Sequence, residues 1–297
     1  MSGKQAFELT TTIGRLGDID VEQLRPYDSV YIGDPFCELG INNLLTDKDA
    51  LLEGIKILKD SSKKIYLSTY VDPRIGTFAG LEHLIEIALK AGVDAVEVSN
   101  LGVLRLIYNH FPGVDIYASN YIRLFNVSAV KALSTFNVKR IVPYPELSLA
   151  EIEEMKENSS VDIELQVHGK IPLGHTELCI LIPQQTKIKN KCAGLCYEGF
   201  ILRSGETAMK AAGRVAFGHK DLCMLNYMGV LLERGFRHFR IESRFENGQY
   251  RFNVGQIYRL HIESLLANRE KLLQINVEGV CNGFYFERPG MEYVQNI

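Results

Sequence analysis

Short apolar runs of the kind found in β-strands recur along the chain, mostly separated by segments whose apolar residues have helical spacing. Eight such runs occur, at Phe7–Thr11, Val30–Gly33, Ile65–Tyr70, Ala95–Ser99, Ile116–Ser119, Arg140–Val142, Ile163–His168 and Phe239–Glu242. Alternating strands and helices predict a parallel sheet covered by helices, and eight units in a chain of 297 residues fit a (β/α)8 barrel of the TIM type. A doubly wound open sheet is the alternative, but no glycine-rich dinucleotide fingerprint follows any of the strands.

Two of the predicted helix-to-strand connections share one pattern. The helical runs Leu84–Ala91 and Leu225–Arg234 are followed by Gly92 and Gly235, and then by a predicted strand. Glycine suits the left-handed residue that closes a helix. We therefore expect each helix to end at its glycine.

The regular spacing stops between His168 and Leu225. A structureless loop of that length is improbable in a compact domain unless something orders it. Four of the six cysteines fall in this segment. We expect a cysteine-bearing insertion at about residues 169–224, near the C-terminal face of the barrel, in which the thiols help to order the chain.

The spacing of the cysteines predicts a metal centre. Cys192 and Cys196 form a C-x3-C pair that a helical turn would place on one face, and Cys179 precedes them across a hinge at Pro183. Cys37 is the best fourth ligand, because it follows an early strand whose end faces the same side of the barrel as the insertion. Four thiolates suit an iron-sulfur cluster.

Other interpretations of the cysteines remain open. Structural zinc sites use thiolates too, although they favour two closely spaced pairs. Cys281 competes with Cys37 for the fourth position, and buried thiols without a metal are common in intracellular enzymes. Cys223, in an apolar helix-like run, is interpreted as a core thiol.

Polar residues at or just beyond the predicted strand ends are candidates for a site at the barrel mouth. His168 could exchange protons, and Glu242 and Arg244 alternate along the last strand, so that both could orient a polar substrate. The remaining candidates are predicted to bind substrate and are Glu97, Asn100 and Asn120. Each has a plainer interpretation: His168 as a histidine that fixes a loop by hydrogen bonds, and the others as the polar rim that any barrel needs.

The composition fits a globular protein, with 46% hydrophobic and 23% charged residues. No linker rich in proline or serine interrupts the chain, so we expect a single domain over residues 1–297. A net charge of -3 argues against a surface that binds nucleic acid along its whole length. No signal peptide or apolar membrane span is apparent, which predicts a cytoplasmic protein.

Several segments resemble the collagenase-like peptidase family of unassigned mechanism. They are Ile163–Gly169, the cysteine segment that follows, Lys220–Cys223 and Gly235–Arg244. The resemblance covers most of the chain. No H-E-x-x-H or G-x-S-x-G motif of a metalloprotease or serine hydrolase occurs, so proteolysis has no support in the residues themselves.

Within this family the chain is most similar to the UbiV-like branch, whose members take part in oxygen-independent ubiquinone hydroxylation. The similar segments are Val30–Cys37, Leu67–Thr69, Ser99–Val103 and Cys281–Gly283. Many family members carry a cysteine shortly after the His-Gly pair, where this chain has Pro172, and in the UbiV-like branch a residue placed like Cys37 supplies that ligand. Lys220–Leu222 and Ile241–Arg244, in contrast, resemble the broader branch that includes RNA-hydroxylating members.

The resemblance implies a [4Fe-4S] protein that helps to hydroxylate an aromatic substrate, a ubiquinone precursor, without dioxygen. It also implies a UbiU-like paralogue as the partner in a heterodimer, and a lipid-carrier protein that presents the precursor. The alternatives are an RNA-modifying hydroxylase or a peptidase of the same family, and a non-enzymatic iron-sulfur partner or sensor. Four cysteine ligands leave no open coordination site, which suits electron transfer and places part of the catalysis on the partner.

Overall fold

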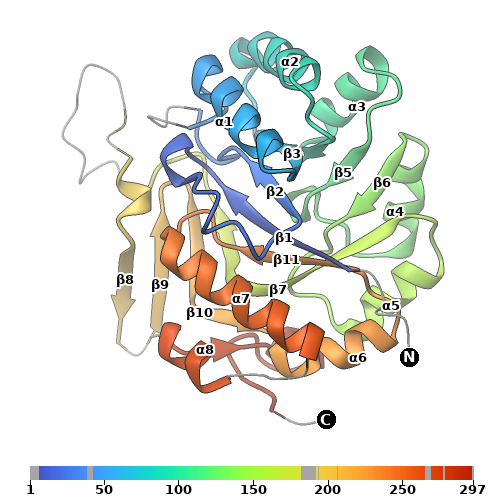
Figure 1. Cartoon of the computed structure of the whole chain (residues 1–297). Helices are drawn as coiled ribbons and strands as arrows, with labels where there is room; N and C mark the ends of the chain where they lie inside the picture. The colour runs from blue at the N-terminus through green and yellow to red at the C-terminus, as the bar shows by residue number, and fades with distance from the viewer. Residues whose placement is uncertain are drawn as a thin grey trace.

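Eight parallel strands close into a barrel in a computed structural model that describes residues 7–38, 43–181, 192, 194–205, 207–264, 269–276 and 278–295 (Figure 1). The barrel strands are β1 (Glu8–Ile13), β2 (Ser29–Ile32), β3 (Lys64–Ser68), β4 (Ala95–Val98), β5 (Ile116–Ala118), β6 (Val138–Ile141), β7 (Asp162–His175) and β11 (His238–Glu242). The ring is closed because β11 pairs in parallel with both β1 and β7. Each predicted strand coincides with one of these strands, and the predicted barrel is confirmed.

Helices follow most of the strands and cover the outside of the barrel (Figure 1). They are α1 (Lys48–Asp60), α2 (Ile75–Lys90), α3 (Leu101–His110), α4 (Val127–Ser134), α5 (Leu149–Glu157), α6 (Met228–Glu233), α7 (Gly248–Ser264) and α8 (Arg269–Ile275). Between β1 and β2 the described chain forms only a short 3-10 turn, η1 (Leu16–Asp18). The apolar core lies between the strands and this helical layer, where Leu9, Phe239 and Val254 are wholly buried.

The two glycine-closed connections are present. Gly92 and Gly235 have φ angles of +97° and +80°, the left-handed conformation that glycine adopts without strain. The second helix is shorter than predicted: a 3-10 turn, η5 (Leu225–Tyr227), leads into α6, and the residues before it end a strand. Cys223 therefore lies on a strand and not in a helix, although it is buried as expected of a core thiol.

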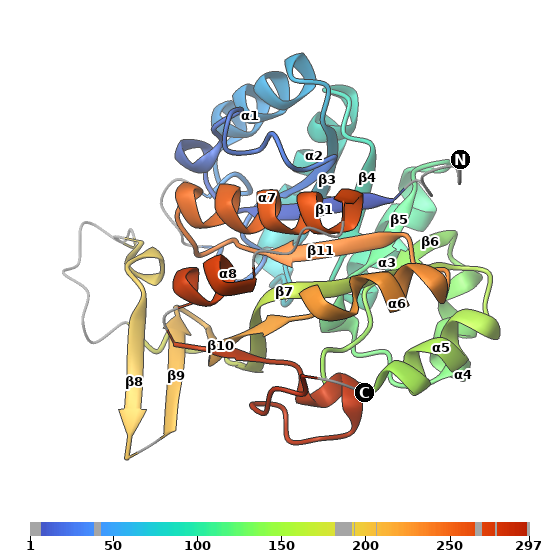
Figure 2. The ribbon, with the colours of Figure 1, turned by 60° about the horizontal axis from the view of Figure 1, so that its bottom comes forward.

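The insertion forms an antiparallel ribbon. Its strands are β8 (Phe200–Ser204), β9 (Thr207–Ala212) and β10 (Val215–Cys223), and β10 pairs with the long C-terminal extension of β7. Figure 2 shows β8 and β9 projecting away from the barrel. Backbone ladder hydrogen bonds thus order the described strands of the insertion. The short strand β12 (Val280–Cys281) adds to the other side of β10.

None of the helices in the described part of the chain is long and apolar enough to cross a membrane.

Candidate functional site

The interior of the barrel is charged. Arg140 forms ion pairs with Glu8 (2.8 Å) and with Glu164 (3.2 Å). Arg240 forms ion pairs with Glu164 (2.8 Å) and with Glu97 (2.7 Å). These side chains come from five strands, so the inward positions of the sheet carry a continuous chain of alternating charges that ends below the barrel mouth.

The geometry of this network keeps Glu164 and Arg240 ionised. Burial alone would raise the pKa of the Glu164 carboxyl, but Arg240 and Arg140 outweigh that effect and the pKa is lowered. Burial likewise opposes the charge on Arg240, and Glu164 and Glu97 raise its pKa well above the usual value. Tyr31 adds a hydrogen bond from its hydroxyl to Glu164 at 2.6 Å. The network holds Arg240 in a fixed position.

A polar pocket lies at the C-terminal mouth of the barrel, directly above this network. Residues from β4, β7, β11 and the loops after several strands line it: Pro35, Glu97, Ser99, Ser119, Asn120, Tyr121, Val142, Gln166, Pro172, Phe217, Arg240, Glu242 and Arg244. The structure thus brings together four of the residues predicted from strand ends, namely Glu97, Asn120, Glu242 and Arg244. The pocket is the candidate functional site.

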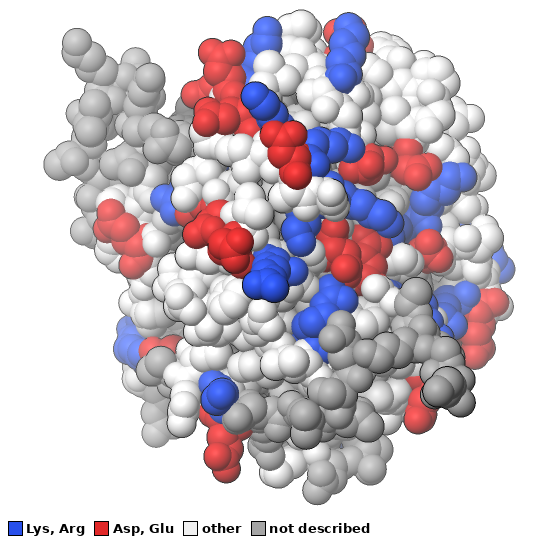
Figure 3. Space-filling view, viewed as in Figure 1, with Lys and Arg blue, Asp and Glu red and all other residues white. Residues whose placement is uncertain are grey.

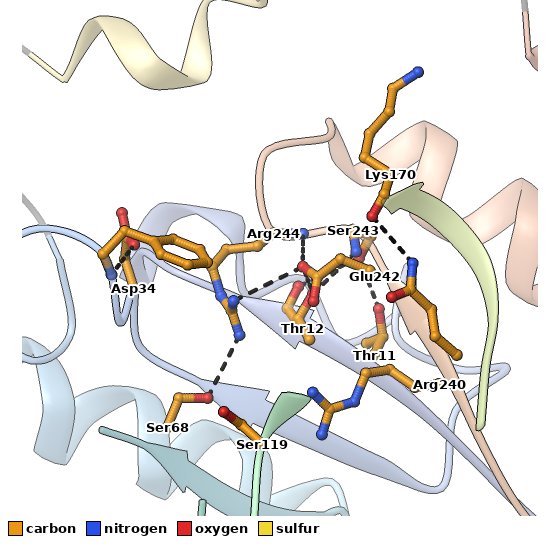
Figure 4. Close-up of polar contacts among 12 residues, drawn as sticks. Thr11, Thr12, Asp34, Ser68, Ser119, Lys170, Arg240, Glu242, Ser243 and Arg244 are labelled. Atoms are coloured by element: carbon orange, nitrogen blue, oxygen red, sulfur yellow. Dashed lines mark hydrogen bonds and ion pairs between the residues drawn. The ribbon is translucent and has the colours of Figure 1, made fainter. Parts of the chain in front are cut away.

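Glu242 and Arg244 face each other, as their alternation on the last strand predicts (Figure 4). The carboxylate of Glu242 accepts hydrogen bonds from the Thr12 hydroxyl (2.7 Å) and from the backbone N–H of Arg244 (3.2 Å). One guanidinium nitrogen of Arg244 lies 3.9 Å from Glu242, and another donates to the Ser68 hydroxyl at 3.4 Å. Both charged groups are therefore fixed by neighbours and not by each other alone.

Three polar atoms in this pocket lack a hydrogen-bond partner among the described residues. They are Oε1 of Glu97, Nη2 of Arg240 and Nε of Arg244. The first two lie 2.7 Å apart as an ion pair, but without the alignment of a hydrogen bond. Because buried polar groups normally have partners, these atoms mark a place for a polar ligand. The open volume there is about 10 Å³, room for about one water molecule, so a larger ligand would enter only when side chains at the mouth move apart.

Asp34 connects the pocket to the cysteines. Its carboxyl is buried, and burial raises its pKa, while Arg244 opposes that shift from the pocket side. On the other side the Tyr197 hydroxyl donates to it at 3.5 Å, and Tyr197 directly follows Cys196. The pocket and the cysteine segment are therefore neighbours.

The four predicted ligands lie in one region of the molecule. Burial raises the pKa of the Cys196 thiol, and the nearby charges of Asp34, Cys192 and Cys37 raise it further. Cys179 approaches the same place through the next residue, Ile180, which donates its N–H to Gly213 (2.8 Å). A Cβ placed on Gly213 would stand 3.6 Å from the Cys196 Cβ.

The described cysteines do not form a complete metal site. The described residues contain no group of three or more His, Cys, Asp or Glu side chains arranged to hold a metal. Cys192 accepts a hydrogen bond from the N–H of Gly194 (3.3 Å), and Cys196 lies in the 3-10 turn η4 (Leu195–Tyr197) and not in the predicted helical turn. Residues 182–191, including the predicted hinge at Pro183, lie outside the described residues.

Cys281 lies in a different environment. It is wholly buried on β12, and burial raises its pKa to about 12. The charges that affect it belong to Asp221, Lys220, Lys170 and Cys223, and not to the cysteines of the insertion. This separation favours Cys37 over Cys281 as the fourth ligand.

His168 does not face the pocket. A bulge in β7 pairs Arg240 with Gln166 but Ile241 with His168, so that one extra residue turns His168 to the outer side of the barrel. There its ring lies 3.3 Å from the Tyr258 hydroxyl and 3.3 Å from the Asn276 side-chain oxygen. Burial lowers its pKa to about 3, so the ring is neutral. The placement agrees with a structural role and not with proton exchange at the mouth.

Asn100 also lies outside the pocket lining. Its side-chain oxygen accepts from the N–H of Gly102 (2.8 Å), and its amide donates to the carbonyl of Val71 (3.2 Å). The residue caps helix α3, which is the ordinary use of asparagine at a helix start.

Several pocket residues were not found from the sequence. Arg240 stands two positions before Glu242, so the period of two along β11 carried the signal there, whereas the bulge in β7 removes that signal between Gln166 and His168. Asp34 follows a predicted strand end. Phe217 comes from the insertion, and no local pattern could place it at the mouth.

Comparisons with known proteins connect this site with a family. The model of peptidase family U32 matches residues 23–295. An uncharacterized protease, MJ0090, of Methanocaldococcus jannaschii is 30% identical over 87% of this chain and 68% of its own length. The tRNA hydroxylation protein P1 of Bacillus subtilis is 25% identical over 90% of this chain and 65% of its own. The 23S rRNA 5-hydroxycytidine C2501 synthase of Escherichia coli is 25% identical over 91% of this chain and 42% of its own.

The solved structure of the U32 peptidase Mk0906 is similar with a TM-score of 0.43 and 14% identity, over 58% of this chain and 72% of that one. The chain spans between 42% and 68% of the length of the three curated relatives named above. The family model, in contrast, covers nearly the whole of this chain, including every described pocket residue and all six cysteines. The chain belongs to peptidase family U32.

Proposed function

We propose that the chain takes part in the hydroxylation of an aromatic ring without dioxygen, and that the ring is a pyrimidine base of RNA. The observation that carries the proposal is the polar pocket of the barrel mouth, which contains the unpartnered Nε of Arg244 and the Glu97–Arg240 ion pair and lies next to the cysteine segment. The names of the relatives support it, since two of those above are named for hydroxylation of tRNA or for 5-hydroxycytidine in rRNA.

The polarity of the pocket favours a heterocycle. A pyrimidine edge presents N–H donors next to carbonyl acceptors, which match a carboxylate and a guanidinium placed side by side. Tyr121 and Phe217 supply aromatic walls, and enzymes that act on a base draw it out of its stack into a pocket of this kind. In this position Glu97 would accept from the base and Arg240 would donate to it.

The cysteines would hold a [4Fe-4S] cluster. Cys37, Cys179, Cys192 and Cys196 fit the group in donor type, since all four are thiols, Cys37 and Cys192 lie near Cys196, and Cys192 already accepts a backbone N–H. With water as the oxygen source, replacing a ring C–H by C–OH releases two protons and two electrons, and an external electron acceptor has to take the two electrons. When bound, the cluster would supply one-electron transfer steps, while the pocket residues bind and orient the ring.

A ubiquinone precursor is the second candidate substrate, and the position of Cys37 favours it. A ligand drawn from the loop after an early strand is the pattern of the UbiV-like branch. In that case the chain would act as the UbiV-like subunit of a heterodimer with a UbiU-like paralogue, and a lipid-carrier protein would present the precursor. A chain that holds its cluster without turnover, as a partner or sensor, is the non-enzymatic alternative.

One experiment separates these functions. The chain is purified anaerobically, alone and co-expressed with each U32 paralogue of its genome, and is then analysed for iron and for partners by size-exclusion chromatography. Total RNA and quinones from a deletion strain grown without oxygen are examined by mass spectrometry. Loss of a hydroxylated pyrimidine supports the proposal, whereas loss of the hydroxylated quinone with RNA unchanged supports the second candidate. A colourless zinc protein that leaves both unchanged contradicts both.

A further inference from the structure

An aromatic pair is exposed next to the mouth of the barrel. The rings of Phe125 and Tyr144 lie 4.9 Å apart, and Phe125 is 45% exposed. The guanidinium of Arg123 lies 5.9 Å from the centre of the Tyr144 ring. We call Arg123, Phe125 and Tyr144 the aromatic shelf.

The residues of the aromatic shelf lie in the same loops as residues that line the pocket. Asn120 and Tyr121, which line the pocket, precede Arg123 and Phe125 in the loop after β5. Val142, which also lines it, stands two residues before Tyr144 in the loop after β6. Because β5 and β6 are paired neighbours, the two loops leave the barrel side by side. A ligand that enters the pocket from this side passes the shelf.

The backbone around the shelf is fixed at both ends. Ser119 caps the 3-10 turn η2 (Asn120–Ile122) through the N–H of Tyr121 (3.1 Å). Asn126 caps α4 by accepting from the N–H of Ala129 (2.9 Å). Between the caps Arg123 adopts a left-handed conformation with φ of +62°, which is uncommon for a residue other than glycine. These caps fix the backbone on both sides of Phe125.

The charges near the shelf are of both signs. The negative charge of Glu146 and the positive charge of Arg123 both act on Tyr144. The chain as a whole has a net charge of -3, and the face in Figure 3 shows acidic and basic side chains interspersed. Single-stranded nucleic acids bind to such aromatic surfaces because every base has a flat apolar face.

We propose that the aromatic shelf stacks the nucleotide next to the base that enters the pocket, and so selects single-stranded RNA over duplex. The inference rests on the proposed function, since it assumes an RNA substrate. One unpaired base would lie on Phe125 and Tyr144 with Arg123 at its edge, while its neighbour occupies the pocket. Recognition of single-stranded loops by stacking on aromatic and arginine side chains is the usual mode for RNA.

Tyr108 provides a matched control. It is 46% exposed and pairs with Phe136 at 5.3 Å, but it lies on helix α3, away from the loops that line the pocket. We would measure binding of short single-stranded oligoribonucleotides containing a central pyrimidine by fluorescence anisotropy, with the anaerobically purified full chain. Phe125→Ala should weaken binding about tenfold or more, the range of one lost base stack, and Tyr108→Ala should leave it unchanged.

A second ligand tests whether the shelf holds the flanking base. An oligoribonucleotide with an abasic site beside the central pyrimidine should bind the native chain about as weakly as the intact oligonucleotide binds Phe125→Ala. The abasic ligand should bind Phe125→Ala only slightly more weakly than it binds the native chain. Phe125→Trp should restore binding of the intact oligonucleotide. If the native chain binds the intact ligand but Phe125→Ala binds it equally well, the shelf has no such role. If the native chain binds no RNA, the result contradicts the proposed function, on which the role of the shelf rests.

Discussion

The barrel and the insertion place their functional residues by different means. In the barrel, Glu97, Arg240 and Glu242 project from paired strands, and each is fixed by ion pairs or hydrogen bonds to its neighbours. The cysteines of the insertion lie on a 3-10 turn and on irregular segments, where Cys192 accepts a backbone N–H. The barrel therefore fixes its pocket residues without a ligand, whereas the proposed cluster would have to complete the arrangement of the cysteines. Four predictions test this contrast.

The largest effect should follow from removing a cluster ligand. Cys37→Ser, Cys179→Ser, Cys192→Ser and Cys196→Ser should each remove most of the bound iron, because the loss of one thiolate leaves an iron open to water and oxidation. Anaerobic iron analysis measures this effect. Cys223→Ser serves as the control and should keep its iron, since the thiol is buried beside Tyr258. Iron that is lost in Cys281→Ser and kept in Cys37→Ser would show that the ligand assignment is wrong.

In the barrel, Glu164→Gln should cost about 3–5 kcal/mol of unfolding free energy, the usual result of breaking a buried ion pair. It leaves Arg140 and Arg240 without their shared carboxylate. Glu153→Gln is the matched control: its pair with Arg234 is half-exposed, so its loss should cost about 1 kcal/mol or less. Denaturant unfolding measures both. Equal effects of the two substitutions would mean that the interior network does not stabilise the barrel.

Arg244→Ala should lower hydroxylation roughly a hundredfold, as expected when a group that orients the substrate is removed. Iron content should be unchanged, because the guanidinium contacts Ser68 and Glu242 and not a cysteine. Product formation and iron are measured on the same sample, and Arg244→Lys should recover part of the activity. If Arg244→Ala fails to fold, Glu242 and Arg244 form a structural pair.

The smallest effect concerns His168 and pH. Its pKa is about 3 in the folded chain against an ordinary histidine pKa of 6.5, so the unfolded chain binds more protons between these values. Stability contributed by the neutral ring is complete above pH 6.5 and falls as the pH drops toward 3, by up to about 1.4 kcal/mol per pH unit.

His168→Gln should therefore flatten the dependence of unfolding free energy on pH between 7 and 5 when measured by denaturant titration. Part of the slope should remain, because burial also lowers the pKa of His175 and His261. His83→Gln is the control, since that side chain is 69% exposed. An unchanged slope in His168→Gln would mean that the buried ring does not titrate as described.

Much of the barrel could be predicted from the sequence because its signals are local. Each strand is a short apolar run, and the glycines after α2 and α6 mark helix ends through a conformation that favours glycine. Period-two alternation also placed Glu242 and Arg244 on one side of the last strand, as the structure shows (Figure 4). These features depend on residues within a few positions of one another, so the chain alone determines them.

Only the tertiary structure decided the rest. One extra residue in β7 reverses the side on which His168 projects, and this bulge exists only through pairing with β11. The extension of β7 and the ribbon of β8, β9 and β10 bring Phe217 to the pocket and Cys179 toward Cys196 through pairings between distant segments. The sequence determined which residues carry the chemistry, and long-range strand pairing decided which of them meet.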